Sequence, residues 1–562
     1  MNGQGCLNNN AFIWIVLLIA FILRVPGIFD GLPAAYNSTE YFLAKTALGM
    51  GARQSLDPLV YVYPTLYAYL LLGLYVIVYV LGLLSGAFSN SVDFAVQFLT
   101  NPSVFYLTGR AVNVLLSVLT VYIFYSQTRK LFGETSGRLA AITAGLSYYF
   151  IFYSHFAVAD TLLILFSTLA TLFILRAYLE PSRRNYAGAG LFSGLAIGTK
   201  YNAGFLVLGV LVILILHRIE KRQPDLWKNA LVLGLSLFAG FFILNPLWIS
   251  KFSNFWDGYR LISAQMQTAV ALYTGKNYLW EMSQIIQHEL FIGIGFFIGT
   301  LVAAIKRKPV HVILLLPIVF TFMYVGSWQK KGIDYLLAVF PAWILLFSFW
   351  LESVWIRFEK QAKLRKALIF LIFIPSIFAG AYQNILAINL DTREQATAWI
   401  MNHVGKEQKI CYENYTFDLG LFDIRRYTEY GAGAAQLPDV VKQRVLDFAD
   451  HPRSISQVPN QIKRESVAVD WDNPYDAEVA VYGRKTLEQL QAEGVRYFIS
   501  NSWYYEPYLE TDTDHFSAVM QQKIAEVRQF YRDVESTGQP VIVFRPDFWH
   551  PGPVITVYDV SR

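Results

Sequence analysis

His155 and Asp160 are the side chains with the clearest chemical potential, because both interrupt long apolar runs. The segment Tyr153–Asp160 lies between the runs Leu139–Phe152 and Thr161–Leu175. An Asp at the centre of a membrane helix costs about 2.5–3.5 kcal/mol, so ionisable residues there mark a site or a water-facing end. Imidazole and carboxylate together suit a divalent cation, with carboxylate favouring Mg²⁺ or Mn²⁺. Two hypotheses stay open: a polar turn that joins two spans, or a metal- or substrate-binding turn.

The composition predicts a protein with many membrane spans. Of the 562 residues, 55% are hydrophobic and 15% are charged, and the mean hydropathy is +0.37. The apolar residues come in long runs rather than in periodic stripes, which excludes a soluble protein of this length. The net charge of +5 is small and gives no indication of nucleic-acid binding. Cys6 and Cys411, at opposite ends of the chain, indicate neither a disulfide framework nor a Cys-based metal site.

The apolar runs and the basic residues between them predict the topology. The first run follows a leader, Met1–Asn10, without Lys or Arg and without a cleavage pattern, so it is interpreted as a retained anchor. Lys and Arg cluster in alternate connections, which by the positive-inside rule are cytoplasmic. The predicted spans are 11–28, 107–127, 139–154, 157–178, 187–200, 203–216, 229–248, 289–305, 309–326, 333–352 and 367–387.

This topology places nearly all ionisable residues near the apolar runs on the external face. The external connections contain the His155–Asp160 turn, Lys200 and the loops 249–288 and 328–334. The stretch 61–86 is ambiguous, since it either crosses the membrane or lies along its outer surface. The side on which Glu40 lies depends on that choice.

The C-terminal part differs in composition from the rest. From Asn389 charged residues become common, helical patterns alternate with short β-rich runs such as Val495–Ile499, and no run could span a membrane. We expect an extracytoplasmic α/β domain at 389–562, of ordinary domain size. Residues 1–388 are expected to form the membrane domain, with an outer loop at 29–106.

An ordered set of short motifs runs through most of the chain. The motifs are Arg24-Val-Pro-Gly, Thr39-Glu40-Tyr41, Leu56-Asp57-Pro58, Tyr63-Pro64-Thr65-Leu66, Tyr153-Ser154-His155-Phe156 with Asp160, Gly194 to Asn202, Asn245-Pro246, Asp334-Tyr335-Leu336-Leu337 with Pro341, Asp391-Thr392-Arg393 with Trp399-Ile400, and Pro551-Gly552-Pro553. This set resembles the GT-C glycosyltransferases. Within them, it resembles the dolichyl-phosphate-mannose–protein mannosyltransferase and aminoarabinose-transferase-like group, of the glycosyltransferase family 39 type.

The resemblance implies a fold and a reaction. It implies a polytopic all-α membrane domain of GT-C type with about eleven spans. It also implies juxtamembrane helices in the first outer loop, and the segment 61–86 would be one of these. It implies an enzyme in the cell membrane with a cytoplasmic N-terminus and an external C-terminal domain. The reaction would move a sugar from a polyprenyl-phosphate donor to an acceptor (protein, lipid or glycan) by inverting single displacement.

One position departs from the family pattern. Where the family has an Asp-Glu pair that supplies the catalytic base and helps to hold the metal, this chain has Thr39 and Glu40. A threonine hydroxyl cannot take up a proton at neutral pH as a carboxylate can. Three alternatives stay open: Glu40 is the base, a nearby acid such as Asp30 or Asp57 is the base, or the protein is inactive.

Roles for the remaining candidates follow from the resemblance, each beside a plainer alternative. Glu40 is the expected base or else a solvated loop acid, and Asp160, His155 and Glu40 are the expected ligands of a divalent cation that would neutralise the leaving phosphate. Lys200, Lys330 and Lys331 are expected at the donor phosphate, or else they are ordinary interfacial charges. Further candidates are Thr39, Asp57, Tyr63, Arg260 and Asp334.

Two other functions compete with glycosyl transfer. Thr39 suggests an inactive GT-C-like protein that binds a polyprenyl lipid or assists a partner. A transporter would show internal pseudo-symmetry and broken helices at mid-membrane, and no repeat is evident in the sequence.

Overall fold

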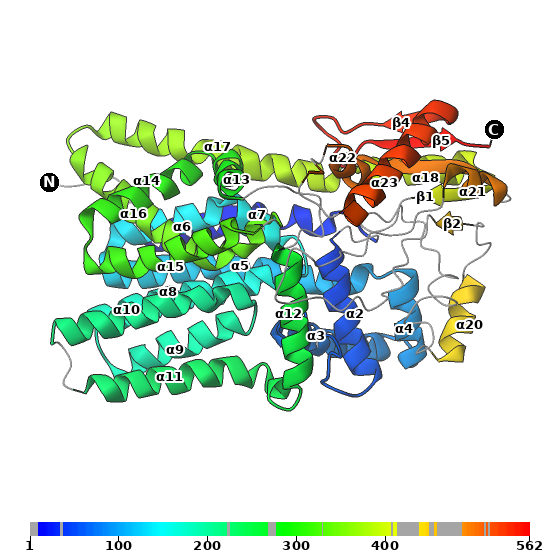
Figure 1. The fold of residues 1–562 in the computed structure, drawn as a ribbon. Helices are drawn as coiled ribbons and strands as arrows, with labels where there is room; N and C mark the ends of the chain where they lie inside the picture. Colours follow the sequence, from blue (N-terminus) through cyan, green and yellow to red (C-terminus); the bar gives the residue numbers. More distant parts are fainter. Residues whose placement is uncertain are drawn as a thin grey trace.

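The computed structural model describes residues 9–33, 37–221, 225–267, 277–328, 330–405, 408–412, 438–448, 455–457, 486–510, 513–514 and 518–561. A bundle of long helices fills one part of the molecule, and a mixed sheet with its helices lies at one end of it (Figure 1). The predicted all-α membrane domain with a C-terminal α/β part is thereby confirmed.

Nine helical stretches in the described residues are long and apolar enough to cross a membrane. Eight of them, together with the shorter helices α6 (Glu134–Leu146), α9 (Arg183–Ile197) and α14 (Phe291–Lys306), correspond to the eleven predicted spans. The number of true spans stays a prediction. The other bundle helices are α1 (Asn9–Ile22), α5 (Ser103–Phe132), α8 (Asp160–Leu179), α10 (Leu206–Ile219), α11 (Leu226–Ile243), α15 (Pro309–Gly326), α16 (Phe340–Arg357) and α17 (Ala362–Ile388).

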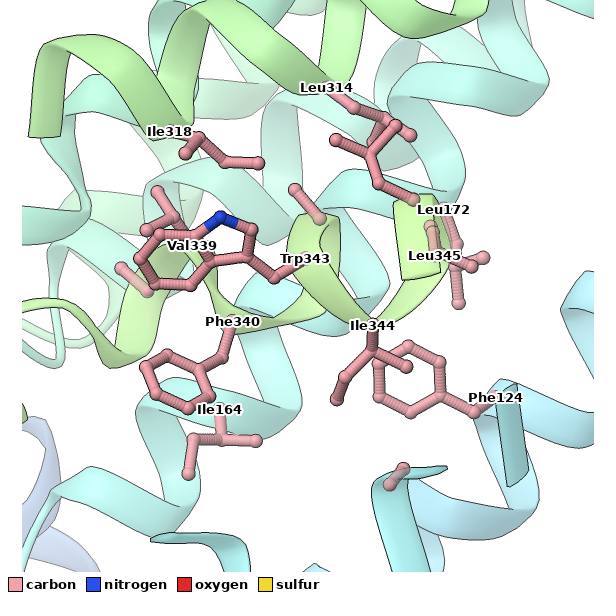
Figure 2. Close-up of a cluster of buried hydrophobic side chains, with 14 of the residues drawn as sticks. Phe124, Ile164, Leu172, Leu314, Ile318, Val339, Phe340, Trp343, Ile344 and Leu345 are labelled. Carbon is pink, nitrogen blue, oxygen red and sulfur yellow. The ribbon is translucent and has the colours of Figure 1, made fainter. Parts of the chain in front are cut away.

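The centre of the bundle is an aromatic and aliphatic core around α16. Figure 2 shows Trp343, Phe340 and Ile344 of α16 among side chains from α5, α8 and α15. The Trp343 ring stacks on Phe296 with 5.9 Å between centroids, and its indole N–H donates to Thr300 Oγ1 at 3.1 Å. Because a buried indole N–H without a partner is costly, this hydrogen bond lets Trp343 fill the core.

Glycines allow α9 and α11 to approach closely. A Cβ at Gly190 would lie 2.2 Å from the Leu233 carbonyl oxygen, and one at Gly194 would lie 2.1 Å from that of Leu237. Small residues at helix contacts are a common packing device in membranes, where van der Waals contact has to replace the hydrophobic effect.

The basic connections lie together at one end of the bundle. Ser136 Oγ donates to Glu352 at 2.6 Å, which joins the start of α6 to the end of α16. Arg176 donates to Gln127 at 3.4 Å, and Tyr178 donates to Glu220 at 3.1 Å, which join the ends of α5, α8 and α10. We call this the basic end. The opposite end, which carries the 155–160 turn, Lys200 and residues 330–335, is called the site end.

Further helices and several 3₁₀ turns cover the site end. The helices are α2 (Ser38–Ala52), α3 (Leu66–Ser85), α4 (Ser91–Thr100), α7 (Tyr148–Ser154), α12 (Phe252–Gln267) and α13 (Tyr278–Glu289), with the 3₁₀ turns η1 (Pro26–Phe29), η2 (Tyr201–Phe205), η3 (Pro246–Trp248), η4 (Ile333–Tyr335) and η5 (Leu337–Val339). In Figure 1, α2 and α12 run across the direction of the long helices.

Helix α3 lies against the first turns of α5. Tyr75 contacts Phe105 with 5.3 Å between ring centroids, and Tyr79 contacts Phe94 of α4 at 5.1 Å. Since Phe105 is only two residues from the start of α5, α3 does not run along the length of the bundle. This position agrees with the juxtamembrane placement that the resemblance implies for 61–86, although α3 is long and apolar enough to cross.

The C-terminal part contains one five-stranded sheet in the order β2-β1-β3-β5-β4. Strands β2, β1 and β3 are parallel, whereas β5 pairs antiparallel with β3 and β4. The strands are β1 (Lys409–Tyr412), β2 (Ile455–Gln457), β3 (Val495–Asn501), β4 (Gln539–Phe544) and β5 (Ile555–Asp559), and the helices are α18 (Thr392–His403), α20 (Asp439–Phe448), α21 (Leu487–Ala492), α22 (Ser502–Glu510) and α23 (Ala518–Thr537). The domain boundary after residue 388 coincides with the end of α17 and stays a prediction.

Candidate functional site

Three predicted residues meet in one ion-pair cluster at the site end. Lys200 Nζ donates to Asp160 Oδ1 at 2.7 Å and to Asp334 Oδ2 at 2.9 Å. Asp160 is the first residue of α8, Lys200 directly precedes η2, and Asp334 lies in η4. Asp160 and Lys200 are buried, whereas a quarter of the Asp334 side chain is exposed (25%). We call these three residues the Lys200 cluster.

A cavity of about 430 Å³ opens beside this cluster. Its wall is mostly aromatic and aliphatic, and Lys200 is the charged residue among those that line it. The lining residues are Val62, Tyr63, Pro64, Lys200, Tyr201, Asn202, Gly204, Phe205, Val207, Leu208, Tyr259, Ile262, Ser263, Met266, Tyr324, Trp328 and Tyr335. An apolar cavity with one convergent cation is suited to a ligand with a long hydrocarbon part and an anionic group.

Thr39 and Tyr63 lie next to the Lys200 cluster. Tyr63 lines the cavity, and its hydroxyl lies beside the Thr39 side chain and close to Lys200 and Asp334. Asn37 caps α2, because its Oδ1 accepts from the backbone N–H groups of Thr39 at 3.1 Å and Glu40 at 3.4 Å. This cap fixes the first turn of α2, and with it Thr39, at the edge of the site.

Glu40 points into a different, fully buried ion pair. Its two oxygens accept from Arg110 at 2.7 and 2.6 Å, and Oε1 also accepts from the Ala157 N–H at 2.7 Å. Both side chains are 0% exposed. A carboxylate held by three donors in a dry site is poorly suited to take a proton from a substrate. The role of Glu40 as base or metal ligand stays untested, and these contacts favour a role in positioning the 155–160 turn.

His155 does not join the Lys200 cluster. The imidazole packs on Gly27, where a Cβ would lie 2.1 Å from Nδ1, and the residue is 2% exposed. The turn that carries it is held by Asn113, which donates to the Phe156 and Val158 carbonyls at 2.7 and 2.9 Å. The His155 ring therefore packs against the η1 segment of the chain.

The predicted metal ligands are not brought together. Glu40 is bound to Arg110, His155 packs on Gly27, and Asp160 is bound to Lys200. In the described part of the chain, no group of three His, Cys, Asp or Glu residues is placed to hold a metal ion. Because the Lys200 ammonium already lies between the two carboxylates of its cluster, these residues do not fit a divalent cation.

Lys330 and Lys331 take different positions. Lys330 lies near Lys200 and Asp334, and burial lowers its pKa below the ordinary value. Its carbonyl accepts from Asn277 Nδ2 at 2.7 Å, which ties the loop to α13. Lys331 instead lies over the ring of Trp280, with Nζ 6.0 Å from the centroid. Of this pair, Lys330 interacts electrostatically with Asp334 and Lys200 of the cluster.

For the other candidate acids and Arg260, the structure shows contacts with residues outside the Lys200 cluster. Asp57 accepts from the Leu59 N–H at 2.9 Å and from Tyr61 at 3.0 Å. Burial works against these hydrogen bonds, yet together with Lys251 they keep the Asp57 pKa below its usual range. Asp57 thus orders its own loop. Asp30 is the other acid considered as an alternative base. Its backbone carbonyl accepts from Arg110 at 2.8 Å. The Arg260 guanidinium lies over Trp256 at 5.5 Å.

Several residues that build the site were missed by sequence reasoning. Arg110 lies inside the predicted span 107–127, and a buried arginine in such a run is itself a signal of a specific partner. Asn245 accepts from the Thr65 N–H at 2.9 Å and so links α3 to the end of α11. Glu289 accepts from Ser147 Oγ at 2.6 Å and from two N–H groups at the start of α7. No local sequence pattern predicts the contacts of Asn245 and Glu289, because each joins residues more than 100 positions apart.

Comparisons with solved structures give several distant matches. The structure is similar to the crystal structure of ArnT from Cupriavidus metallidurans in the apo state, with 12% identity, 98% of this chain and 97% of that chain covered, and a TM-score of 0.48. The crystal structure of the same protein bound to undecaprenyl phosphate matches with 13% identity and a TM-score of 0.46, and 97% of each chain is covered. The archaeal oligosaccharyltransferase AglB from Archaeoglobus fulgidus, in complex with an inhibitory peptide and a dolichol-phosphate, matches with 12% identity and a TM-score of 0.43. This match covers 90% of this chain and 71% of that chain.

The family comparison is more specific. The comparison with curated proteins gave no match. Residues 106–244, which include Arg110, Asp160 and Lys200, match the family model described as dolichyl-phosphate-mannose-protein mannosyltransferase. The resemblance inferred from the sequence is thus confirmed: over this region the chain is similar to the mannosyltransferase family of GT-C type.

Proposed function

We propose that the protein is a membrane glycosyltransferase that moves a sugar from a polyprenyl-phosphate donor to an acceptor at the site end. The observation that carries this proposal is the apolar cavity of about 430 Å³ with the Lys200 ammonium in its wall. The family match over residues 106–244, which include Lys200, supports the same assignment.

The cavity offers separate places for the two parts of such a donor. The aromatic and aliphatic wall around Phe205, Leu208 and Tyr324 suits the prenyl chain. Lys200 uses two N–H groups on Asp160 and Asp334, which leaves its third N–H for a phosphate oxygen. Lys330, whose burial lowers its pKa, adds a second cation when protonated.

The chemistry we propose is a single displacement. The acceptor nucleophile attacks the anomeric carbon as the bond from that carbon to the phosphate oxygen breaks, and polyprenyl phosphate leaves. Lys200 and Lys330 stabilise the negative charge on the leaving phosphate. Asp334 is the acid of the cluster with an exposed part, so we assign it the acceptor proton. Glu40 positions the 155–160 turn. A bound divalent cation would neutralise the phosphate, but no residue set described above fits one.

We further propose that the site end is extracytoplasmic and that the protein resides in the cell membrane. The basic connections gather at the opposite end, and by the positive-inside rule that end is cytoplasmic. The acceptor class is left open among protein, lipid and glycan. A transporter fits less well, because the ionisable cluster is at helix ends: Asp160 begins α8, and Lys200 follows α9.

Lipid binding tests the proposal directly. We expect the purified protein in nanodiscs to bind undecaprenyl phosphate, and Lys200→Met to weaken binding at least tenfold. Lys251→Met is the matched control, since Lys251 pairs with Asp57 outside the cavity. Equal binding by wild type and Lys200→Met, with Lys251→Met also unchanged, would contradict the proposed donor site.

Thr39 supports a second candidate, an inactive GT-C-like protein that binds the lipid. The hydroxyl of Thr39 lies at the site where the family pattern has a carboxylate. Transfer from polyprenyl-phosphate sugars should be measured for wild type, Thr39→Asp, Asp334→Asn and Glu40→Gln. Transfer by wild type that Asp334→Asn abolishes supports the enzyme. Transfer that appears only with Thr39→Asp supports the inactive protein.

A further inference from the structure

The Lys200 cluster has the oxygen arrangement of a cation site, with an ammonium at its centre. Asp160 Oδ1 and Asp334 Oδ2 come from elements 174 positions apart and converge on one point, at 2.7 and 2.9 Å from Lys200 Nζ. Carboxylate oxygens that converge from different elements are the usual first ligands of Mg²⁺ or Mn²⁺.

We propose that the Lys200 ammonium is the resident cation of this site and takes the place of a divalent metal ion. The inference rests on the proposed function, because it assigns the leaving phosphate to a protein cation held by two carboxylates. It implies that donor binding does not depend on a divalent metal.

Burial and backbone contacts hold the ammonium in place. Lys200 is 7% exposed. Its backbone N–H donates to the Ala196 carbonyl, in the last turn of α9, at 3.1 Å. The neighbouring Thr199 donates to the Leu195 carbonyl at 2.8 Å, and Asn245 of the α11 end donates to the Gly198 carbonyl at 3.4 Å. With the backbone fixed between α9 and α11, the short distance to both carboxylates is built into the fold.

The ammonium and a metal ion exclude each other at this point. A divalent ion that used the same two oxygens would lie within a few ångströms of Nζ and would repel it strongly in a buried site. Two carboxylates and one ammonium leave the cluster with one formal negative charge, whereas removal of the ammonium leaves two carboxylates close together without a cation between them. Removal of Lys200 should therefore expose a divalent-ion site that the wild-type protein does not have.

Mn²⁺ binding measured by electron paramagnetic resonance tests this inference without reference to transfer activity. The proteins are wild type, Lys200→Met and the double variant Lys200→Met/Asp160→Asn, each treated with EDTA and titrated with Mn²⁺. We expect Lys200→Met to bind Mn²⁺ at least tenfold more tightly than wild type, and the double variant to lose that gain. Mn²⁺ binding by wild type as tight as that by Lys200→Met would overturn the proposal, and so would equally weak binding by the two proteins.

A second measurement covers the case in which Lys200→Met does not fold. A ligand that binds only the native state raises the melting temperature, so Mn²⁺ should leave the wild-type melting temperature unchanged. A rise that Asp334→Asn abolishes would overturn the proposal. Binding of undecaprenyl phosphate to EDTA-treated wild type distinguishes this inference from the proposed function. If the lipid does not bind either with or without Mn²⁺, the proposed function is contradicted. If the lipid binds only when Mn²⁺ is present, the proposal that the Lys200 ammonium replaces the metal is contradicted.

Discussion

Buried charges in this protein are held by specific partners, and the Glu40–Arg110 pair shows why. Each Glu40 oxygen accepts from the guanidinium, and Nη1 of Arg110 donates to the carbonyls of Ile28 and Asp30 at 2.7 and 2.8 Å. One buried pair thus joins the η1 segment, α2 and α5. Removal of one partner leaves the other charge unpaired, which costs more than the loss of the pair as a whole.

Glu40→Gln should therefore destabilise the protein by about 3–5 kcal/mol. The measurement is unfolding in detergent followed by intrinsic fluorescence. The double variant Glu40→Gln/Arg110→Met is the control, because it removes the unpaired guanidinium and should recover part of the loss. If Glu40→Gln unfolds like wild type, the positioning role assigned to Glu40 is wrong.

Glu281 is an acid without hydrogen-bond partners in the described residues, and it gives a pH-dependent prediction. The residue is 0% exposed, neither carboxylate oxygen has a partner, and burial raises its pKa to about 8. The unfolded state loses this proton near pH 4.5, whereas the folded state keeps it until about pH 8. Stability should thus be highest at low pH, fall through this window and level off above it.

Glu281→Gln removes the titrating group. We expect the variant to melt a few degrees above wild type at pH 9, and the difference to shrink as the pH falls toward 5. The melting curves should be recorded across this range in one buffer series. A difference that is constant with pH would show that Glu281 is not the group responsible.

At the scale of elements, the contact between α9 and α11 depends on glycine. The sequence predicted both spans, because long apolar runs are sufficient for that. It could not show that Gly190, Gly194 and Gly240 lie at a backbone contact, since glycine is frequent in membrane helices for several reasons. The same holds for α3, whose composition fits a span, whereas its aromatic contacts with Phe94 of α4 and Phe105 place it at the start of α5.

Gly194→Ala should destabilise the protein by about 1–3 kcal/mol, the usual cost of overpacking. The new Cβ would lie 2.1 Å from the Leu237 carbonyl oxygen, so the two helices must separate. Gly234→Ala on α11 is the matched control, because a Cβ there has nothing within 4 Å. Thermal unfolding of both variants decides the point; an equal effect of the two substitutions would contradict the close contact.

At the scale of the whole molecule, the sequence predicted which residues lie at the same end of the bundle. It predicted less well which of those residues are in contact. Alternating basic connections separated Asp160, Lys200 and Asp334 from the basic loops, and the structure brings these three together. The ion pairs themselves could not be predicted, because a run of apolar residues fixes the direction of a helix and leaves its rotation open. Glu40 was expected to share a metal site with Asp160 because of the resemblance, whereas in the structure it accepts from Arg110.

The orientation of the bundle in the membrane is the remaining prediction at this scale. Single cysteines at Ser55 in the first loop, Asp439 in α20 and Lys308 at the basic end are all exposed in the structure. In a background without Cys6 and Cys411, a membrane-impermeant maleimide added to the external side of sealed cells should label positions 55 and 439. Position 308 should react only after permeabilisation.

Position 55 decides between the two possible placements of α3. If α3 crossed the membrane, the first loop would be on the side opposite to the C-terminal part, and positions 55 and 439 would react from different sides. A contact of the first loop itself argues against that arrangement, because Asp57 of this loop forms an ion pair with Lys251 of the predicted external loop 249–288. Labelling of position 55 together with position 308 would remove the first loop from the extracytoplasmic face. The donor site proposed around Lys200 and Tyr63 would then be wrong, since Tyr63 belongs to the same loop.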